Sequence, residues 1–513
     1  MTPVRYLETA GVRGVGPLAV ASGPTSATTT FSIPIEVVED DRVSSWILAF
    51  VAGELAGLTP VDSLDTDPQW VVSPQVLVGF LIGDIPYHEL LRTSDLRMPL
   101  QLLYFFGGYL ARPAVRRHFR RHLLGETGSE VPADNAAAPG QTAPACVAPT
   151  SVSGAHDLVE WIREIVADRD LATGIQLYVS KDGDTLIDLA LGTDGLGRSI
   201  QPDSLPLVRC ALAKPVLAIE VASLVSSGEL SYETTVGDVL SGASGFVSGL
   251  SVDELLTHRA GMYELTGAFL SVLDPDHRLS SVLRAGPPAA FERHANVAYA
   301  DGGGAVLIAA MLERITGLDY EKIFATRLDP DGQLSQNIQF RPTGVDYERI
   351  VIDSWIQSDF PVPYHIEETP EYVAEWNPGW GGYASARGLG LLYERVLDTL
   401  HGRPSLGRLD PATASEMLAD RWVPSNVDSA YRNDPTAIFS FSRGFCHGFA
   451  DYGVPEERRP HVFGHSGQGA AIAMADAGSG LVISCKFFGQ INEARHFSAR
   501  GSRLVGEIFA LTS

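Results

Sequence analysis

The chain of 513 residues has few positive charges and no long apolar run. Lysine and arginine number 38 against 62 aspartates and glutamates, so the formal net charge is −24. Nucleic acids and anionic membrane surfaces attract clustered basic side chains, and this balance therefore argues against both as partners. No stretch reaches the roughly 18 consecutive apolar residues of a transmembrane helix, so we expect no membrane span.

Cysteine is also scarce, and its spacing argues against a metal cluster. Cys146, Cys210, Cys446 and Cys485 form no Cys-x-x-Cys pair. The first residues, "MTPVRYLETAGVRGVGPLAV", lack the continuous apolar segment that follows a basic start in a secretory signal. We therefore expect a cytoplasmic protein with reduced thiols, and neither a metal nor another cofactor.

A stretch rich in Ala, Pro, Gly, Ser and Thr divides the chain at residues 126–154. It has no hydrophobic period, which is typical of a flexible linker. Before it, residues 42–58 and 98–125 have apolar patterns that we interpret as helices, so residues 1–125 are expected to form a small, mainly helical domain of unknown role. Residues 155–513 would form a second, larger domain.

Helix and strand patterns predict an α+β fold for the second domain. Residues 155–170 have the spacing of an amphipathic helix, and residues 174–180 and 185–192 are expected to be strands joined by an Asp-Gly turn. Near the C-terminus we expect three strands and a closing helix, over residues 461–467, 470–477, 481–488 and 496–513. Strands from both ends of a domain can join one antiparallel sheet, which leaves the middle to form a helical lobe.

The stretch "VRCALAKPVLAIE", residues 208–220, has the pattern of half a catalytic pair at the start of a helix. We expect this helix to start near Ala211 and to end at Gly228. Its apolar stripe would be Leu212, Val216, Ile219, Ala222 and Leu224. Residues 211 and 214 share a helix face, so a hydroxyl at position 211 would lie beside the Lys214 amine. A buried amine loses proton affinity and can act as a base, but the residue at position 211 is alanine.

Five segments, in order along the chain, resemble the serine β-lactamase and penicillin-binding protein superfamily, in particular its class C β-lactamase-like esterase and transacylase branch. They are "SLPLVRCALAKPVLAIEVASLVSSGEL", "LTHRAGM", "VAYADGGGAVLIAAMLERITGLDYEKI", "WNPGWGGYASARGLGLLYERVL" and "FGHSGQG". In that family they carry Ser-x-x-Lys, Leu-x-His-x-x-Gly, Tyr-x-Asn, a glycine-rich segment, and Lys-Thr-Gly or His-x-Gly. The resemblance covers about residues 155–513 and implies an antiparallel sheet flanked by helices, with a helical lobe.

The resemblance implies a catalytic role for each motif residue. Ala211 occupies the position of the nucleophilic serine, and Lys214 matches the lysine that activates it. Tyr299 matches the tyrosine that takes the serine proton and passes one to the leaving group. His465 matches the residue that orients tyrosine and substrate. The backbone N–H groups of Ala211 and Gln468 would form the oxyanion hole, which survives the loss of the serine hydroxyl.

Other motif residues are expected to bind substrate or shape the site. Asp301 replaces the asparagine of Tyr-x-Asn, and a carboxylate there would hold Lys214 charged. Gly467 ends the His-x-Gly motif and is expected to line the substrate site. Trp380, in the segment "GWGGY", could wall an acyl pocket, although core packing explains it equally well. His258, within "LTHRAGM", is expected to fix a turn beside the site.

Three explanations for Ala211 stay open. An original serine has been replaced on purpose, the protein has lost hydrolysis and uses the Lys–Tyr pair for other proton transfers, or it only binds a ligand. The intact motif residues at 214, 299 and 465 disfavour the last. The thiol of Cys210 is a poor substitute nucleophile, because one residue along a helix turns about 100° and should point it into the core.

We therefore expect an esterase or transacylase for a small acyl or ester substrate, with a biosynthetic role and no acyl-enzyme chemistry while alanine occupies position 211. The strings "WVVSPQVLVGFLIG" and "LQLLYFFGGYL" are more apolar than the small N-terminal domain needs for its own core. We expect part of that surface to meet the second domain at the mouth of its cleft, a dimer mate or an acyl-carrying partner.

Overall fold

The protein is described by a computed structural model. It covers residues 30–39, 42–51, 54–61, 70–72, 95–96, 146–147, 155–168 and 171–512, the last range with gaps at 196, 264, 266–274, 289–290, 354–372, 374–375, 404–405, 420, 426–439, 468–470 and 492–495. By its internal contacts the chain divides into two compact units. The first contains residues 1–141, 195–197 and 354–372, and the second contains the remaining residues.

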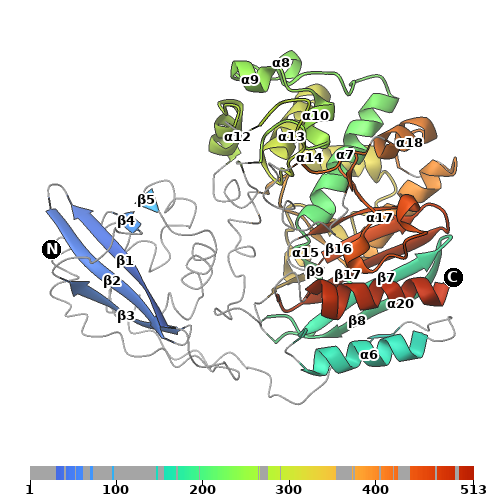
Figure 1. Cartoon of the computed structure of the whole chain (residues 1–513), viewed down its shortest axis with the longest axis horizontal. Helices are drawn as coiled ribbons and strands as arrows, with labels where there is room; N and C mark the ends of the chain where they lie inside the picture. Colours follow the sequence, from blue (N-terminus) through green and yellow to red (C-terminus); the bar gives the residue numbers. More distant parts are fainter. Residues whose placement is uncertain are drawn as a thin grey trace. The chain divides into compact units, whose positions relative to one another are not determined.

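The described part of the first unit is a β-sheet. Its strands are β1 (Thr30–Glu39), β2 (Arg42–Val51), β3 (Glu54–Val61), β4 (Trp70–Val72) and β5 (Asp95–Leu96), in the order β3-β2-β1-β4-β5 (Figure 1). β1 and β2 pair antiparallel from end to end, with Thr30 opposite Val51 and Glu39 opposite Arg42. The helix that we predicted over residues 42–58 is therefore wrong.

The prediction failed because a short apolar run does not by itself distinguish a helix from a strand. The segment is rich in β-branched and aromatic residues, which favour strands, and Gly57 weakens a helix. The other predicted helix, residues 98–125, lies outside the described residues. So does most of the predicted linker, except that Cys146–Val147 form β6.

The second unit is built on an eight-stranded antiparallel sheet of order β13-β14-β15-β16-β17-β7-β8-β6. Besides β6, its strands are β7 (Gly174–Lys181), β8 (Asp184–Gly192), β13 (Ser440–Phe441), β14 (Cys446–His447), β15 (Val462–Gly467), β16 (Ala471–Asp476) and β17 (Leu481–Phe488). The five predicted strands of this unit are confirmed. Asp182 and Gly183 both have positive φ, 52° and 86°, as a tight two-residue hairpin turn requires. Strands from both ends of the unit meet where β17 pairs with β7.

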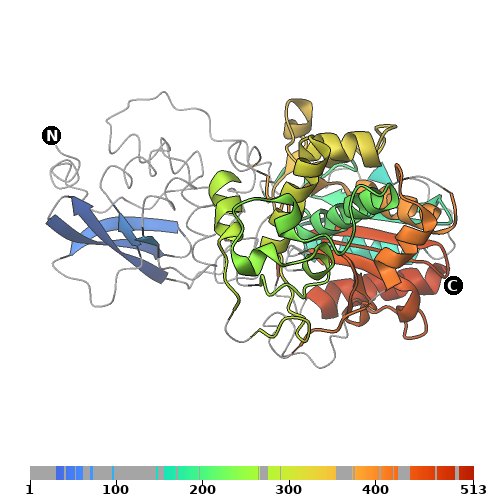
Figure 2. The same cartoon turned by 90° about the horizontal axis from the view of Figure 1, so that it is seen from above.

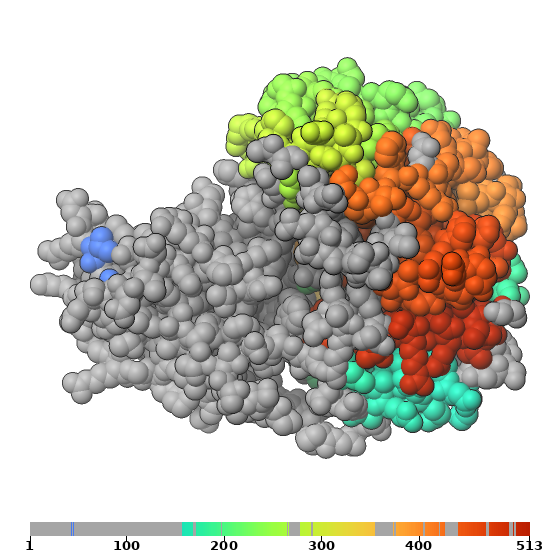
Figure 3. Space-filling model, in the orientation of Figure 1, coloured from blue at the N-terminus to red at the C-terminus, as the bar shows by residue number. Residues whose placement is uncertain are grey.

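Helices cover both faces of this sheet. On one face, the apolar side chains of α6 (Ala155–Asp168) and α20 (Ser502–Thr512) pack on β7 and β17, and Figure 3 shows the two helices side by side. On the other face, α7 (Cys210–Ser226) and α17 (Ala386–Leu400) pack on the alternate residues of β15 and β16 (Figure 1). The predicted α+β class is confirmed.

A helical lobe stands at one end of the α7 face. It contains α8 (Val236–Val239), α9 (Gly245–Ser248), α10 (Val252–Leu256), α12 (Pro275–Leu283), α13 (Gly303–Thr316) and α14 (Tyr320–Ile323), green to yellow in Figure 2. Two small strand pairs, two helices and several tighter or wider helical turns make up the rest of what the structure describes in this unit. They are β9 (Leu205–Pro206) with β11 (Ile350–Val351), β10 (Ile338–Gln339) with β12 (Tyr383–Ala384), α15 (Val345–Glu348), α18 (Pro411–Ala419), and the turns Phe324–Leu328, Ala450–Tyr452, Arg459–His461 and Phe497–Gly501.

α7 is buried on every side between the sheet and the lobe. All residues from Cys210 to Leu224 are buried, so the predicted single apolar stripe is wrong: lobe and sheet cover the helix all round. The helix ends as predicted, with Gly228 in the left-handed conformation at φ 71°. None of the helices in the described part of the chain is long and apolar enough to cross a membrane.

Candidate active site

The first turns of α7 carry both residues of the predicted Ser-x-x-Lys position. Ala211 is fully buried and Lys214 is 5% exposed. The Lys214 Nζ donates a hydrogen bond of 2.9 Å to the Ala300 carbonyl and lies 5.3 Å from the centre of the Tyr299 ring. The structure therefore brings the lysine and the tyrosine of the two motifs together, although they are 85 positions apart in the sequence.

Tyr299 and Asp301 lie in the segment that leads into α13. The segment is fixed by hydrogen bonds on both sides of the tyrosine: Ala298 N–H donates to the His258 carbonyl at 3.0 Å, and Ala300 N–H donates to His258 Nδ1 at 3.2 Å. On the other side, Gly379 packs so closely that a Cβ there would come within 2.4 Å of the Asp301 carbonyl oxygen. The glycine-rich segment around Gly379 therefore supports the backbone of the Tyr-x-Asp motif.

His465 and Gly467 extend along β15, which packs against α7. A Cβ on Gly467 would lie 3.4 Å from the Ala211 Cβ, so the end of the strand touches the nucleophile position. The His465 ring centre is 6.1 Å from that of Tyr299. Ala211, Lys214, Tyr299, His465 and Gly467 thus converge on one place.

The electrostatic state of His465 follows from its burial. Burial, together with the positive charge of Lys214, lowers the pKa of His465 to about 3, so the ring is neutral near pH 7. Its Nδ1 lies 2.6 Å from the Ser466 carbonyl oxygen and must donate to it, which leaves Nε2 as an unprotonated acceptor. This Nε2 has no hydrogen-bond partner among the described residues. His465 therefore offers a substrate an acceptor and not a charge.

The thiol of Cys210 is buried, as expected, but it lies among the site residues. Its Sγ is 3.6 Å from the Gly379 carbonyl oxygen. Burial raises the pKa of the Cys210 thiol, and the charge of Lys214 and a hydrogen bond with the Tyr299 hydroxyl oppose that rise only in part. A protonated, buried thiol is a weak nucleophile. This agrees with the prediction that Cys210 is a poor substitute for the serine.

The remaining predicted residues are placed less completely. Trp380 is buried and packs under Arg209, whose guanidinium carbon is 5.1 Å from the ring centre. Its role as the wall of an acyl pocket stays a prediction. Gln468, predicted to supply the second oxyanion-hole N–H, lies outside the described residues. In the part of the chain that the structure describes, no three histidine, cysteine or acidic side chains gather as metal ligands would.

The sequence predicts only part of the role of His258. It was expected to fix a turn, and its φ of 60° does so, but it also binds the backbone on both sides of Tyr299. Its place in the Leu-x-His-x-x-Gly segment was the one signal that pointed to the site. The specific contacts depend on tertiary structure.

Comparisons with known proteins agree with this geometry. The family model described as Beta-lactamase matches residues 158–493. Among solved structures, a penicillin-binding protein homologue from Caulobacter crescentus is 22% identical, with 71% of this chain and 99% of that chain covered and a TM-score of 0.57.

Two solved enzyme structures are similar to this chain to about the same degree. A family VIII carboxylesterase is 19% identical, with 71% and 99% covered and a TM-score of 0.58. EstCE1, described as a hydrolase with promiscuous acyltransferase activity, is 15% identical, with 68% and 98% covered and a TM-score of 0.54. Likeness at these identities shows the fold alone. No curated protein matches the sequence.

Proposed function

Because the chain belongs to the Beta-lactamase family, we propose that its second unit is an esterase or transacylase domain for a small acyl or ester substrate, with Ala211 at the nucleophile position. The observation that carries this proposal is the convergence of Lys214, Tyr299 and His465 on Ala211. The solved carboxylesterase and EstCE1, the hydrolase with acyltransferase activity, support the choice of ester chemistry.

The geometry suggests how a serine at position 211 would react. Its hydroxyl would lie next to Lys214 and Tyr299, and Tyr299 would take its proton as the oxygen attacks the ester carbonyl. The positive charge of Lys214, held by the Ala300 carbonyl, would favour Tyr299 as the phenolate that accepts this proton and so becomes a phenol. Tyr299 would then protonate the departing alcohol, and water or a second alcohol would take the acyl group from the serine.

The proposal is tested by Ala211→Ser. We expect turnover of activated esters and a covalent adduct of a serine-reactive probe on residue 211, because Lys214 and Tyr299 lie close to this position. Intact-mass spectrometry and peptide mapping locate the adduct. Ala213→Ser is the matched control, since Ala213 is equally buried on the same helix but two residues away from the nucleophile position.

A result that contradicts the proposal would be equally clear. If Ala211→Ser gives neither an adduct on residue 211 nor more ester turnover than Ala213→Ser, the acyl-transfer assignment is wrong. A soluble, folded Ala211→Ser protein, checked by its thermal unfolding, is the condition for reading that result.

A second candidate function follows from the alanine itself. A chain that keeps Lys214, Tyr299 and His465 without a nucleophile could use the Lys–Tyr pair for proton abstraction or elimination. In that case the Ala211 protein is active as it stands, and Tyr299→Phe and Lys214→Ala abolish that activity. If both variants bind ligands as the parent does and no activity is lost, the domain is a binding module.

The cellular role remains a proposal of the same kind. We infer a biosynthetic acyl substrate, a cytoplasmic location and, for the first unit, contact with the site or with an acyl-carrying partner. The apolar strings of the first unit support the last inference.

A further inference from the structure

His258 is a strained and deeply buried residue next to the site. It follows α10 with φ at 60°, a left-handed conformation that non-glycine residues rarely adopt, and it is 4% exposed. Strain of this kind persists only where the surrounding structure enforces it, and such positions cluster at functional sites.

The hydrogen bonds of His258 and one of its ring contacts hold Tyr299 and the residues beside it. Its carbonyl and its Nδ1 accept the N–H groups of Ala298 and Ala300, the residues on either side of the tyrosine. Its ring centre is 4.7 Å from that of Tyr299 and 4.8 Å from that of Phe441. Phe441 in turn stacks on Tyr299 at 5.6 Å.

We propose that His258 is the positioning residue of Tyr299: it fixes the backbone before and after the tyrosine and one side of its ring. The inference rests on the proposed function, in which Tyr299 is the proton-transfer group. It gives His258 a specific task that a turn-forming residue would not have.

A neutral histidine suits this task. To accept the Ala300 N–H, Nδ1 must be unprotonated, so the ring proton sits on Nε2. Burial, with the positive charge of Lys214 adding to it, holds the pKa of His258 well below its usual range. The acceptor is therefore kept over the whole range in which the protein is expected to work.

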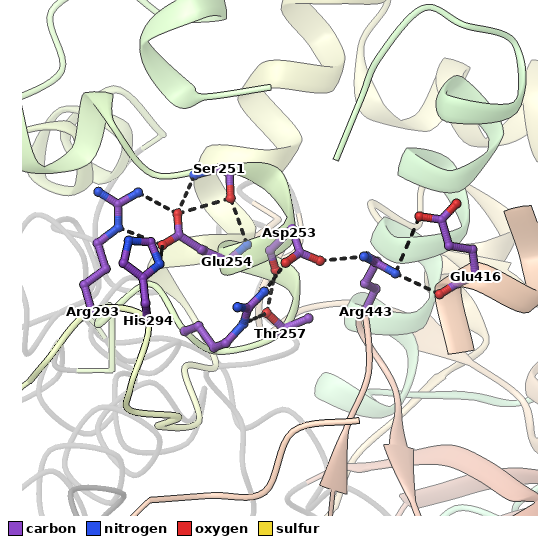
Figure 4. A network of polar contacts seen from close by, with 9 residues as sticks. Ser251, Asp253, Glu254, Thr257, Arg293, His294, Glu416 and Arg443 are labelled. Atoms are coloured by element: carbon purple, nitrogen blue, oxygen red, sulfur yellow. Dashed lines mark hydrogen bonds and ion pairs between the residues drawn. The ribbon is translucent and has the colours of Figure 1, made fainter. Parts of the chain in front are cut away.

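The element that presents His258 is itself fixed (Figure 4). Ser251 and Glu254 form a capping box at the start of α10, and Glu254 accepts two hydrogen bonds of 2.7 Å from Arg293. Asp253 pairs with Arg259 and accepts a bond of 2.7 Å from Arg443. These contacts tie α10 to the segment ahead of Tyr299 and to the loop after β13, so His258 acts from a rigid support.

Two substitutions separate the two contributions of His258. His258→Phe keeps a ring against Tyr299 and Phe441 but loses the acceptor. His258→Asn keeps an acceptor oxygen in the place of Nδ1 and tolerates the left-handed conformation. His496→Asn is the control, since His496 is also buried and accepts a hydrogen bond of 3.1 Å from Arg500, beside the ring of Phe487 in β17.

The first measurement is the acylation rate in the Ala211→Ser background, separated from substrate binding by rapid kinetics. A small misplacement of a proton-transfer group can cost about 100-fold in rate, so we expect His258→Phe to slow acylation by about 10- to 100-fold, with the substrate Kd unchanged. His258→Asn should recover most of that loss, and His496→Asn should leave the rate unchanged. Equal losses in the Phe and Asn variants, or no loss in either, would overturn the proposal.

The second measurement does not depend on the chemistry. A fluorotyrosine is placed at position 299 of the Ala211 protein, and its ¹⁹F resonance is recorded. We expect one sharp resonance in the parent and in His258→Asn, and a shifted or exchange-broadened one in His258→Phe. An identical resonance in all three refutes the positioning role, even if Ala211→Ser never acylates and the proposed function fails by itself.

Discussion

At position 465 the protein offers a hydrogen-bond acceptor, where the lysine of a Lys-Thr-Gly motif would offer a positive charge. The acceptor is the neutral Nε2 that remains when Nδ1 is given to Ser466. Such a group suits a hydroxyl or amide N–H of a substrate and cannot pair with a carboxylate.

We therefore predict that Ala211→Ser reacts faster with neutral esters than with β-lactams and other acyl donors that carry a carboxylate. Adding His465→Lys should raise the rate for carboxylate-bearing donors relative to neutral esters by about tenfold, the worth of one charge-assisted hydrogen bond. Because the pKa of His465 is about 3, the ring gains no charge in the neutral range, and the preference should stay constant between about pH 5 and about pH 8. Competition kinetics with paired substrates measure it. A preference for the carboxylate-bearing donor in Ala211→Ser alone would contradict this account.

Single residues differ in how far their roles follow from sequence. The positions of Lys214, Tyr299 and His465 could be assigned because each lies in a short motif, and the motifs occur in the order of the family. The bonds of His258 could not be assigned in this way. Its Nδ1 meets an N–H 42 residues later, and only the packing of the lobe determines that contact.

Among the elements, α7 is unusual in holding an acid inside a helix that is covered on every side. Glu220 is 1% exposed, and burial raises the pKa of its carboxyl well above the usual range, with the hydroxyl of Tyr320 opposing and Glu313 adding to the rise. The folded protein therefore favours the protonated form. The contribution of Glu220 to stability is complete below the pKa that its carboxyl has in the unfolded chain. This contribution is lost as the pH rises through the higher pKa of the folded state.

Glu220→Gln should consequently stabilise the protein at high pH. The amide keeps the shape of the side chain and removes the cost of ionisation, so we expect the free energy of unfolding at pH 8 to rise by more than about 1.4 kcal/mol, the equivalent of one pKa unit. Near pH 4 the variant and the parent should unfold alike. Urea denaturation at the two pH values tests this, and a gain that is the same at both would mean that ionisation of Glu220 is not the cause.

The helices and strands also show which sequence patterns predict structure reliably. In the second unit, hairpin strands, the closing helix and the end of α7 at Gly228 follow from alternation and turn residues. In the first unit, residues 42–51 form β2 and residues 54–61 form β3, although the apolar spacing of residues 42–58 also fits a helix. The burial of α7 all round could not be predicted either, since it depends on a lobe and a sheet that meet around it.

At the scale of the whole molecule, the chain holds two compact units, and the task of the first is still a proposal. Its expected function is to control access to the site of the second. A fragment that tests this must begin at Thr142, because β6 (Cys146–Val147) pairs with Leu189 and Ala190 of β8.

We expect residues 142–513, carrying Ala211→Ser, to fold and to accept large esters more readily than the full chain does. The ratio of rates for a large and a small ester should change by roughly threefold or more, as removal of a cover over a site would cause. Steady-state kinetics and thermal unfolding of both proteins measure this. If the fragment matches the full chain in stability and in that ratio, the first unit has no part in access.

The pairing of β7 with β17 also governs when this site can come into being. During synthesis α7 and the lobe leave the ribosome long before residues 462–488, which supply β15, β16 and β17. Until those strands arrive, one side of the mostly apolar helix α7 has no cover, and β7 has only β8 beside it. Such long-range pairing is slow, and the exposed intermediate is open to aggregation. We therefore expect the nascent chain to be most prone to aggregation until about its last fifty residues have been made.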